Sequence, residues 1–266
     1  MTQRREAISE PMKREVRQRC GFGCVVCGKP FYEYDHIEEY SEVKGHSAEN
    51  LTLLCPDHHS EKTRGLRTRL QVEYANANPF NKVNGRSSPY LLPYGGAASR
   101  ILVGSNQFVH DIGPVYQEPV VLNGEPVLQV RAEAGRLLMR ARFSDSSGAT
   151  ILTIDDNELS YNTDLWDVEF VANRLVVRQA AGKIVTKVVF NPPDSLNVER
   201  AFFSHDGLTV KVAPREICYE GSGGRASYSG CSFLNMPYPR GIVMTDRAHV
   251  DASPAAVHFV FGVGSG

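Results

Sequence analysis

The sequence predicts an α+β fold: a small N-terminal domain of strands and helices, followed by an all-β domain, an antiparallel sandwich or barrel. Two observations support this prediction. Cysteines and histidines at metal-ligand spacings are concentrated in the first quarter of the chain, and short alternating strands follow one another beyond residue 98. Residues 78–90 are rich in Asn, Pro, Gly and Ser, which is typical of a linker. We therefore expect domains at residues 1–77 and 98–266, joined by residues 78–97.

The first expected element is a helix over residues 9–19. Ser9 is a suitable N-cap, and Pro11 occupies an early position where a helix tolerates the missing N–H. The sequence "GFG" at residues 21–23 ends the helix, because glycine is favoured just past a helix terminus. A turn that carries two cysteines follows.

Two short strands and a helix come next. Residues 31–37 are aromatic-rich and "LTLL" at residues 51–54 is apolar, and both compositions favour strands. The stretch "PDHHSEKTRGLRTRLQVEYAN" begins with Pro56 and is typical of a helix, with a break near Gly65. The order of elements is therefore strand, loop, strand, helix.

Alternation of apolar and polar residues marks the C-terminal half. In "RLLMRARF" the residues of one face are apolar: Leu137, Met139, Ala141 and Phe143. Asn123-Gly124 is a strong signal for a two-residue hairpin turn. Turn sequences such as "SDSSG" and "SHDG" recur between short strands, which indicates antiparallel β structure.

Composition narrows the class of protein. The 266 residues carry a formal net charge of −1, with 42% hydrophobic and 22% charged residues, which is ordinary for a globular protein. We find no apolar run of the roughly 18 residues that a membrane-spanning helix needs, and no secretory signal at the N-terminus. We therefore expect a cytoplasmic protein without membrane contact. Six cysteines in a reducing compartment are more typical of metal ligands or free thiols than of disulfides.

Two close pairs of ligand-type residues predict a structural zinc site. Cys24-x-x-Cys27 is the first pair and Cys55-x-x-His58 is the second. A tight turn with two intervening residues presents both side chains to one ion, and structural zinc takes four such thiolate and imidazole ligands in a tetrahedron. The small domain is therefore expected to be zinc-stabilised. The alternative is four unliganded residues in a small core.

This assignment leaves Asp35, His36, Asn50 and His59 unexplained. A helix turns by about 100° per residue, so His59 cannot face the ion that its neighbour His58 faces. His59 is instead expected to face the first strand, where Asp35 and His36 lie. Neighbouring strand residues point to opposite faces, so Asp35 and His36 can serve one site only if the strand is locally distorted. Two centres fit this pattern better than one.

The spacing "CVVC…DHI…N…LCPDHH…K" resembles that of the HNH endonuclease family. The three letters correspond here to His36, Asn50 and His59, and the resemblance covers roughly residues 14–70. It implies the ββα-metal fold of that family, in which one divalent cation bridges the scissile phosphate.

The resemblance also implies a role for each remaining residue. Asp35 and His59 would hold a catalytic Mg²⁺ or Mn²⁺, and a neutral His36 would deprotonate the attacking water. The amide of Asn50 would tie the connecting loop rather than take part in the chemistry. Lys62 and Arg64 lie one turn beyond His59, where we expect them to contact backbone phosphates.

Two departures from the family pattern stand out. Many members have a proline two residues after the Asp-His pair, whereas this chain continues "DHIEEY". The second zinc pair often ends in Cys, whereas here it ends in His58. Neither change removes a required type of ligand, but the first leaves the path of the chain after Ile37 open.

The function expected from these residues is that of a metal-dependent endonuclease acting on nucleic acid, most simply double-stranded DNA, with a bacterial restriction or anti-phage role as an analogy. The alternative is a zinc-containing nucleic-acid-binding or regulatory protein without cleavage activity, in which His36 is an ordinary core histidine. His46, in the loop "KGHSAEN", is expected to be solvated.

The β-rich domain has three competing roles at this stage. It could recognise the target, form a homo-oligomer, or sense an activating ligand or partner. A nuclease core of about 60 residues has little surface for choosing a substrate, and affinity for DNA depends largely on neutralised phosphates. We therefore expect this domain to add DNA-binding surface or a second copy of the core.

Overall fold

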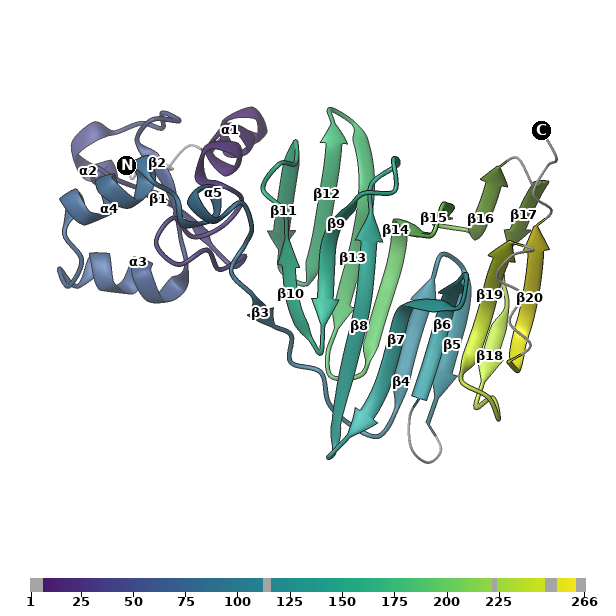
Figure 1. The fold of residues 1–266 in the computed structure, drawn as a ribbon. Coiled ribbons are helices and arrows are strands. Elements are labelled where there is room, and N and C mark those ends of the chain that lie inside the picture. The colour runs from purple at the N-terminus through teal and green to yellow at the C-terminus, as the bar shows by residue number, and fades with distance from the viewer. Residues whose placement is uncertain (1–6, 112–115, 222–223, 247–252, 262–266) are drawn as a thin grey trace. The chain divides into compact units, whose positions relative to one another are not determined.

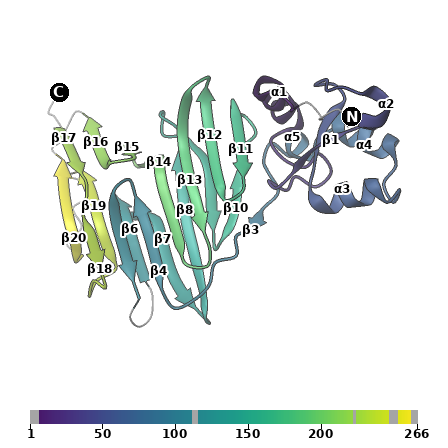
Figure 2. The same cartoon turned by 180° about the vertical axis from the view of Figure 1, so that it is seen from behind.

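The computed structural model describes residues 7–111, 116–221, 224–246 and 253–261 (Figures 1 and 2). By their contacts, the residues separate into two compact units. The first unit contains Met1–Tyr90 together with Ser160–Val171, and the second contains Leu91–Leu159 with Ala172–Gly266. The expected combination of a small ββα region and a large all-β region is confirmed.

The first unit contains five helices and three short strands in its described residues. These elements are α1 (Glu10–Cys20), β1 (Glu33–His36), α2 (Tyr40–Val43), β2 (Leu51–Leu54), α3 (Pro56–Thr63), α4 (Arg69–Ala77), α5 (Phe80–Asn84) and β11 (Asp167–Val171), with β3 (Tyr90–Leu91) and β10 (Glu158–Tyr161) at the division between the units. β1 and β2 pair antiparallel, with Asp35 opposite Thr52 and His36 opposite Leu51.

The helix boundaries follow from capping residues. Gly21 ends α1 in the left-handed conformation, at φ 69°, and its N–H bonds to the carbonyl oxygen of Arg17. The expected break near Gly65 separates α3 from α4, and Thr68 begins α4 with a capping box that includes Gln71. α2 follows the Asp-His pair in the stretch whose path the sequence left open.

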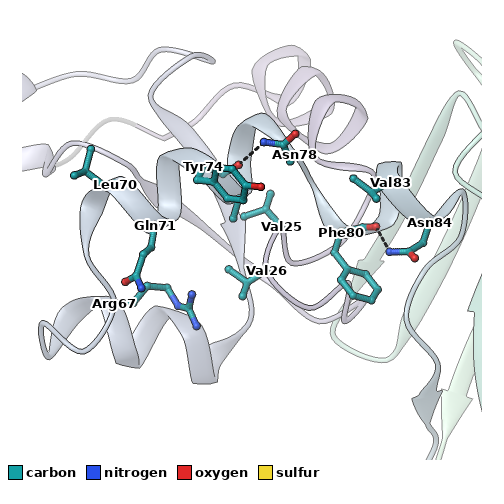
Figure 3. A pocket seen from close by; sticks show the side chains of 11 residues that line it. Val25, Val26, Arg67, Leu70, Gln71, Tyr74, Asn78, Phe80, Val83 and Asn84 are labelled. Atoms are coloured by element: carbon teal, nitrogen blue, oxygen red, sulfur yellow. Dashed lines mark hydrogen bonds between the residues drawn. The ribbon is translucent and has the colours of Figure 1, made fainter.

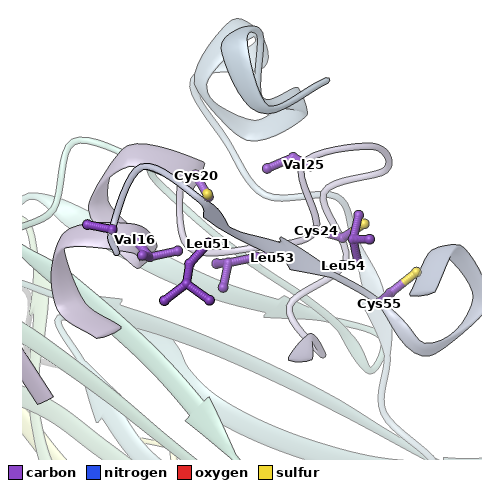
Figure 4. Close-up of a cluster of buried hydrophobic side chains, with 9 residues drawn as sticks. Val16, Cys20, Cys24, Val25, Leu51, Leu53, Leu54 and Cys55 are labelled. Carbon is purple, nitrogen blue, oxygen red and sulfur yellow. The ribbon is translucent and has the colours of Figure 1, made fainter. Parts of the chain in front are cut away.

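The core of the first unit lies between α1, the turn that follows it, and β2 (Figure 4). All four residues of β2 are buried, so this strand is covered on both faces. α5 lies in the stretch whose composition suggested a linker, and its Asn81 is buried and donates a hydrogen bond to the carbonyl oxygen of Gly21. The turn after α1 is thus fixed by β2 and by α5.

A segment distant in the sequence completes the first unit. Arg17 of α1 is 2% exposed, and its Nε and Nη2 donate to the two carboxylate oxygens of Asp167 at 2.8 Å each. Arg17 Nη1 also donates to the hydroxyl of Tyr34 at 2.9 Å. Tyr161 donates from its hydroxyl to the carbonyl oxygen of Phe22 at 2.7 Å. Residues 160–171 therefore supply buried polar partners to the nearby α1 region.

Removing the carboxylate of Asp167 should strongly destabilise the protein. Asp167 is 0% exposed, so Asp167→Ala removes both 2.8 Å contacts of the buried Arg17 and leaves it only the more distant carboxylate of Glu169, at 3.5 Å. Breaking one side of a buried ion pair costs about 3–5 kcal/mol. Chemical denaturation should show this loss. The exposed Asp164 gives the matched control, since Asp164→Ala should change the free energy of unfolding by less than about 0.5 kcal/mol. Equal stability of the two variants would contradict the assignment.

The second unit is built from strands. They are β4 (Ser99–Val103), β5 (Asn106–His110), β6 (Tyr116–Leu122), β7 (Glu125–Glu133), β8 (Arg136–Ser144), β9 (Thr150–Asp155), β12 (Arg174–Ala180), β13 (Lys183–Asn191), β14 (Ser195–His205), β15 (Leu208–Ala213), β16 (Glu216–Gly221), β17 (Gly224–Tyr228), β18 (Ser232–Leu234), β19 (Arg240–Asp246) and β20 (Ala255–Phe261). The apolar face expected for residues 137–143 is buried in β8. Asn123 and Gly124 form the expected tight turn with positive φ at both positions.

Among the described residues, most strand pairs are antiparallel, as expected, and four are parallel. Most antiparallel pairs join neighbours in the chain, such as β6 with β7 and β7 with β8, but β14 also pairs antiparallel with β8. The parallel pairs are β14 with β4, β18 with β5, and β19 with both β6 and β20. β14 belongs to two sheets, since residues 195–198 pair with β4 and residues 201–205 pair with β15. Among the helices in the described residues, none combines the length and the apolar character needed to cross a membrane.

Candidate functional site

Four ligand-type side chains converge where β2 runs into α3. Cys24 and Cys27 come from the turn after α1, Cys55 precedes the first residue of α3, and His58 lies in the first turn of that helix. Their ligand atoms all lie within 4.8 Å of one another. The Sγ atoms of Cys27 and Cys55 are 3.8 Å apart, and His58 Nδ1 lies 3.2 Å from Cys55 Sγ and 3.3 Å from Cys24 Sγ.

These separations fit one zinc ion. Bonds of about 2.3 Å to sulfur in a tetrahedron place two sulfurs about 3.8 Å apart, which is the separation of the Cys27 and Cys55 sulfurs. Hydrogen bonding from Cys27 lowers the pKa of the Cys24 thiol, against the opposing effect of burial. This favours the thiolate of Cys24, the form that binds metal. The expected Cys3His cluster is confirmed as a set of residues compatible with zinc.

A second group of side chains lies between α3 and β1. His59 follows His58 directly, yet its ring contacts different residues, because α3 rotates by about 100° per residue. Its Nε2 lies 3.4 Å from Asp35 Oδ1, and its Nδ1 lies 2.8 Å from Glu33 Oε2. Ligands at about 2.1 Å and at right angles around a cation are about 3 Å apart, so Asp35 and His59 fit a divalent cation between them.

Glu33 is a residue of this site that the sequence reasoning missed. Its carboxylate contacts the Nδ1 edge of His59, which directs the Nε2 edge of the ring toward Asp35. Metal-ligating histidines commonly use a carboxylate in this way, which fixes the tautomer and the orientation of the ring. The signal was present in the sequence, because Glu33 is two positions before Asp35 and therefore lies on the same face of β1.

His36 lies at the end of β1 and is 3% exposed. Its Nε2 is 3.0 Å from Nδ1 of His46, and the two rings stack with centroids 5.1 Å apart. The ring of Tyr40 lies edge-on to His36 at 5.2 Å between centroids. His46 is half-buried in this cluster, so the expectation that it is solvated is wrong. Spacing along the chain does not reveal the contact, because the loop must fold back to make it.

Asn50 closes the loop that carries these rings. Its side-chain oxygen accepts from the N–H of Glu38 at 2.7 Å, and its Nδ2 donates to the carbonyl oxygen of Glu38 at 2.9 Å. The N–H of Ile37 also donates to the carbonyl oxygen of Asn50. This arrangement ties the end of β1 to the start of β2. The path of the chain after Ile37, which lacks the usual proline, is thus defined by Asn50.

Lys62 lies beside the second group and has three acidic or carbonyl neighbours. Its Nζ donates to the carbonyl oxygen of His36 at 2.6 Å, and it lies 2.9 Å from both Asp35 Oδ2 and Glu39 Oε1. Burial opposes the charge, but the hydrogen bonds to Asp35 and Glu39 outweigh it and raise the pKa of Lys62. Arg64 follows α3 and is exposed. The structure thus places Lys62 against the carboxylates and Arg64 on the surface.

The helix α3 therefore separates a zinc-type cluster from a carboxylate–histidine site, with Asn50 holding the loop beside them. Residues 24–65 match the HNH endonuclease family. The HNH match includes every residue of both groups and ends before α4. A search of curated proteins and a search of solved structures both find no match.

An apolar groove on the first unit shares no lining residue with the zinc-type cluster or the carboxylate–histidine site (Figure 3). It has a volume of about 550 Å³ and is lined by Val25, Val26, Arg67, Leu70, Gln71, Tyr74, Ala75, Asn78, Phe80, Val83 and Asn84. Its lining contains no histidine, cysteine or carboxylate, so the chemistry of the HNH motif does not take place there. A smaller polar hollow of about 300 Å³ adjoins the carboxylate–histidine site at Lys62. Its lining is of mixed charge, with Lys62, Arg67 and Arg69 beside Glu39 and Glu42.

Proposed function

We propose that this protein is a metal-dependent endonuclease that hydrolyses phosphodiester bonds in double-stranded DNA. One observation carries the proposal: Asp35 and His59 present donor atoms 3.4 Å apart, on the side of α3 away from the zinc cluster, within the segment that matches the HNH family. A carboxylate and an imidazole form a donor pair for Mg²⁺, Mn²⁺ or a softer ion.

Each residue of the site would have its own role. Asp35 and His59 would hold the cation, and Glu33 would orient His59. When bound, a divalent cation stabilises the charge that develops on the phosphate and on the leaving oxygen. His36 would take the proton of the attacking water, as a neutral imidazole can near pH 7. Asn50 would hold the loop between the two strands in place.

Phosphate binding would come from Lys62 and Arg64. Lys62 is protonated and now bonds to Asp35 and Glu39, so it would exchange a carboxylate for a phosphate oxygen as substrate and cation arrive. Arg64 is exposed. Arg67 and Arg69 line the adjoining polar hollow, but both are held in ion pairs with acidic side chains, so Lys62 and Arg64 carry the proposal. Basic side chains that contact the backbone position the nucleic acid without reading its sequence.

The second candidate function is a zinc-containing nucleic-acid-binding or regulatory protein that does not cleave. The burial of His36 favours this alternative, because a side chain that is 3% exposed resembles a core histidine. The HNH match and the Asp35–His59 geometry favour the nuclease. Catalytic contacts often tighten only once substrate binds, so the burial of His36 alone does not exclude a base.

Plasmid cleavage distinguishes the two candidates. Wild-type protein should convert supercoiled plasmid to nicked or linear DNA with Mg²⁺ or Mn²⁺, and a chelator should stop the reaction. His59→Ala should keep one zinc per chain, by elemental analysis, and lose cleavage. Failure of the wild type to cut DNA with either ion would contradict the proposal. If His59→Ala lost zinc and His58→Ala kept it, the two histidines would have the opposite roles. A parallel assay on RNA tests the choice of substrate.

Glu33→Gln should weaken the catalytic cation site without affecting zinc. A neutral amide orients His59 less strongly than a carboxylate, and loss of such an outer partner typically costs about 10–100-fold in metal affinity or activity. Titration of cleavage against Mn²⁺ should show a shifted midpoint. Glu15→Gln is the matched control, because Glu15 is an exposed carboxylate of α1 and does not line the polar hollow beside the site. Identical titrations for wild type and Glu33→Gln would remove Glu33 from the site.

The second unit and the biological role extend this proposal. We assign the protein to the cytoplasm, where its thiols stay reduced, and to a restriction or anti-phage function by analogy. The second unit would then supply target recognition, dimerisation or sensing of an activating ligand. Light scattering of the full-length protein, together with plasmid binding as a function of salt, separates dimerisation from added phosphate contacts.

A further inference from the structure

The loop between β1 and β2 folds back over His36. α2 begins this loop at Tyr40, and Lys44 ends the short helix in the left-handed conformation at φ 50°. The chain then turns through Gly45 and brings His46 alongside His36. Asn50 fastens the loop at its base through its two hydrogen bonds to Glu38. The position of His46 is thus set by the fold of the loop.

The contact between the two imidazoles is a directed hydrogen bond. His36 Nε2 and His46 Nδ1 are 3.0 Å apart, which is within the normal range for a bond between two ring nitrogens. Only one of the two atoms can carry the shared proton. The centroid of the Tyr40 ring lies 5.2 Å from the centroid of each imidazole. Tyr40 therefore gives His36 an apolar contact that is independent of the hydrogen bond to His46. Packing alone therefore does not require a histidine at position 46.

We propose that His46 is a positioning residue that fixes the tautomer and orientation of His36 for its role as general base; this inference rests on the proposed nuclease function. When Nδ1 of His46 accepts, Nε2 of His36 carries the proton and Nδ1 of His36 keeps its lone pair. Nδ1 is then the atom that takes the proton of water. A hydrogen-bond partner that selects one tautomer in this way is a recurring device for catalytic histidines.

Two substitutions of similar shape test the proposal. His46→Asn places an amide oxygen near the position of Nδ1 and preserves an acceptor, whereas His46→Leu has the same branching without one. His46→Leu should lower kcat for plasmid cleavage by about 10–100-fold, the usual effect of removing an outer partner, with KM unchanged. His46→Asn should recover most of this loss. Both variants should keep one zinc per chain and the melting temperature of the wild type to within a few degrees.

A second readout does not depend on cleavage. Long-range ¹H–¹⁵N NMR spectra of the zinc-loaded protein report which nitrogen of a neutral imidazole carries the proton. The wild type and His46→Asn should show His36 protonated at Nε2, and His46→Leu should lose this preference. Wild-type kcat in His46→Leu, or equal losses in the Leu and Asn variants, would overturn the proposal, as would a wild-type His36 protonated at Nδ1. If the wild type failed to cleave but showed the Nε2 proton, the proposed function would fail and the hydrogen bond would stand.

Discussion

Cys55→Ser is expected to release the zinc and unfold the first unit. Cys55 is 0% exposed, and its sulfur lies within 3.8 Å of both Cys27 Sγ and His58 Nδ1. A serine hydroxyl does not replace a thiolate on zinc. Structural zinc contributes about 10–16 kcal/mol to the folding of small domains, which equals or exceeds the roughly 5–15 kcal/mol that separates a folded domain from its unfolded chain.

Zinc content by elemental analysis and thermal unfolding by circular dichroism measure the effect. Cys20→Ser is the matched control, since Cys20 is also 0% exposed in the same core and its sulfur contacts Asn76 rather than the zinc cluster. Burial raises the pKa of the Cys20 thiol, which keeps it a neutral core residue. The control should retain one zinc per chain. A folded Cys55→Ser protein with one zinc per chain would show that Cys55 is not a ligand.

The zinc cluster could be predicted because the geometry within each pair of ligands is local. Two residues separate the ligands of each pair, and the two pairs meet where the N–H of Val25 donates to the carbonyl oxygen of Leu53. The same holds for His59, whose direction follows from the rotation of α3. Asp167 is different: it lies 150 positions from Arg17, and only the tertiary fold brings the two together. A periodic pattern within a short stretch of sequence cannot predict such a pair.

Local sequence predicts where a strand forms, whereas the partner with which the strand pairs depends on the tertiary fold. Alternation predicted the buried face of β8, but it does not specify neighbours, so the parallel pairs of β14 and β19 could not be foreseen. Charges follow this rule too. The sequence shows that Arg140 and Lys187 are basic, but it does not show that they pair with Asp156 and Glu199. The described structure therefore gives these two residues no free charge for DNA.

The ion pair between Arg17 and Asp167 also affects how the role of the second unit should be tested. Truncation near residue 85 would remove Asp167 and Tyr161 and leave Arg17 buried without its carboxylate. Loss of activity in such a fragment would then report misfolding of the first unit. Measurements on the full-length chain avoid this ambiguity, and this is why light scattering and salt dependence are proposed for the intact protein.

His36→Ala is expected to lower plasmid cleavage by about 10²–10⁴-fold, the usual loss when a general base is removed. Zinc content and DNA binding should stay close to wild type, because His36 belongs to neither the zinc cluster nor a phosphate contact in the proposed mechanism. His36 is 3% exposed, so alanine also leaves a cavity. His36→Gln separates the two effects. The Nε2 of glutamine can still donate to His46, but an amide has no basic nitrogen that could take the proton of water. This variant should be as inactive as alanine and more stable.

A double variant tests whether His36 and His46 act as one unit. If His46 works only by positioning His36, then adding His46→Leu to His36→Ala should cause no further loss of kcat, although His46→Leu alone lowers kcat by about 10–100-fold. Residues that share one catalytic function are non-additive in this sense. Near wild-type cleavage by His36→Ala would remove the base and favour a non-cleaving zinc protein or another base. Additive losses would instead mean that His46 affects cleavage by a route independent of the 3.0 Å contact.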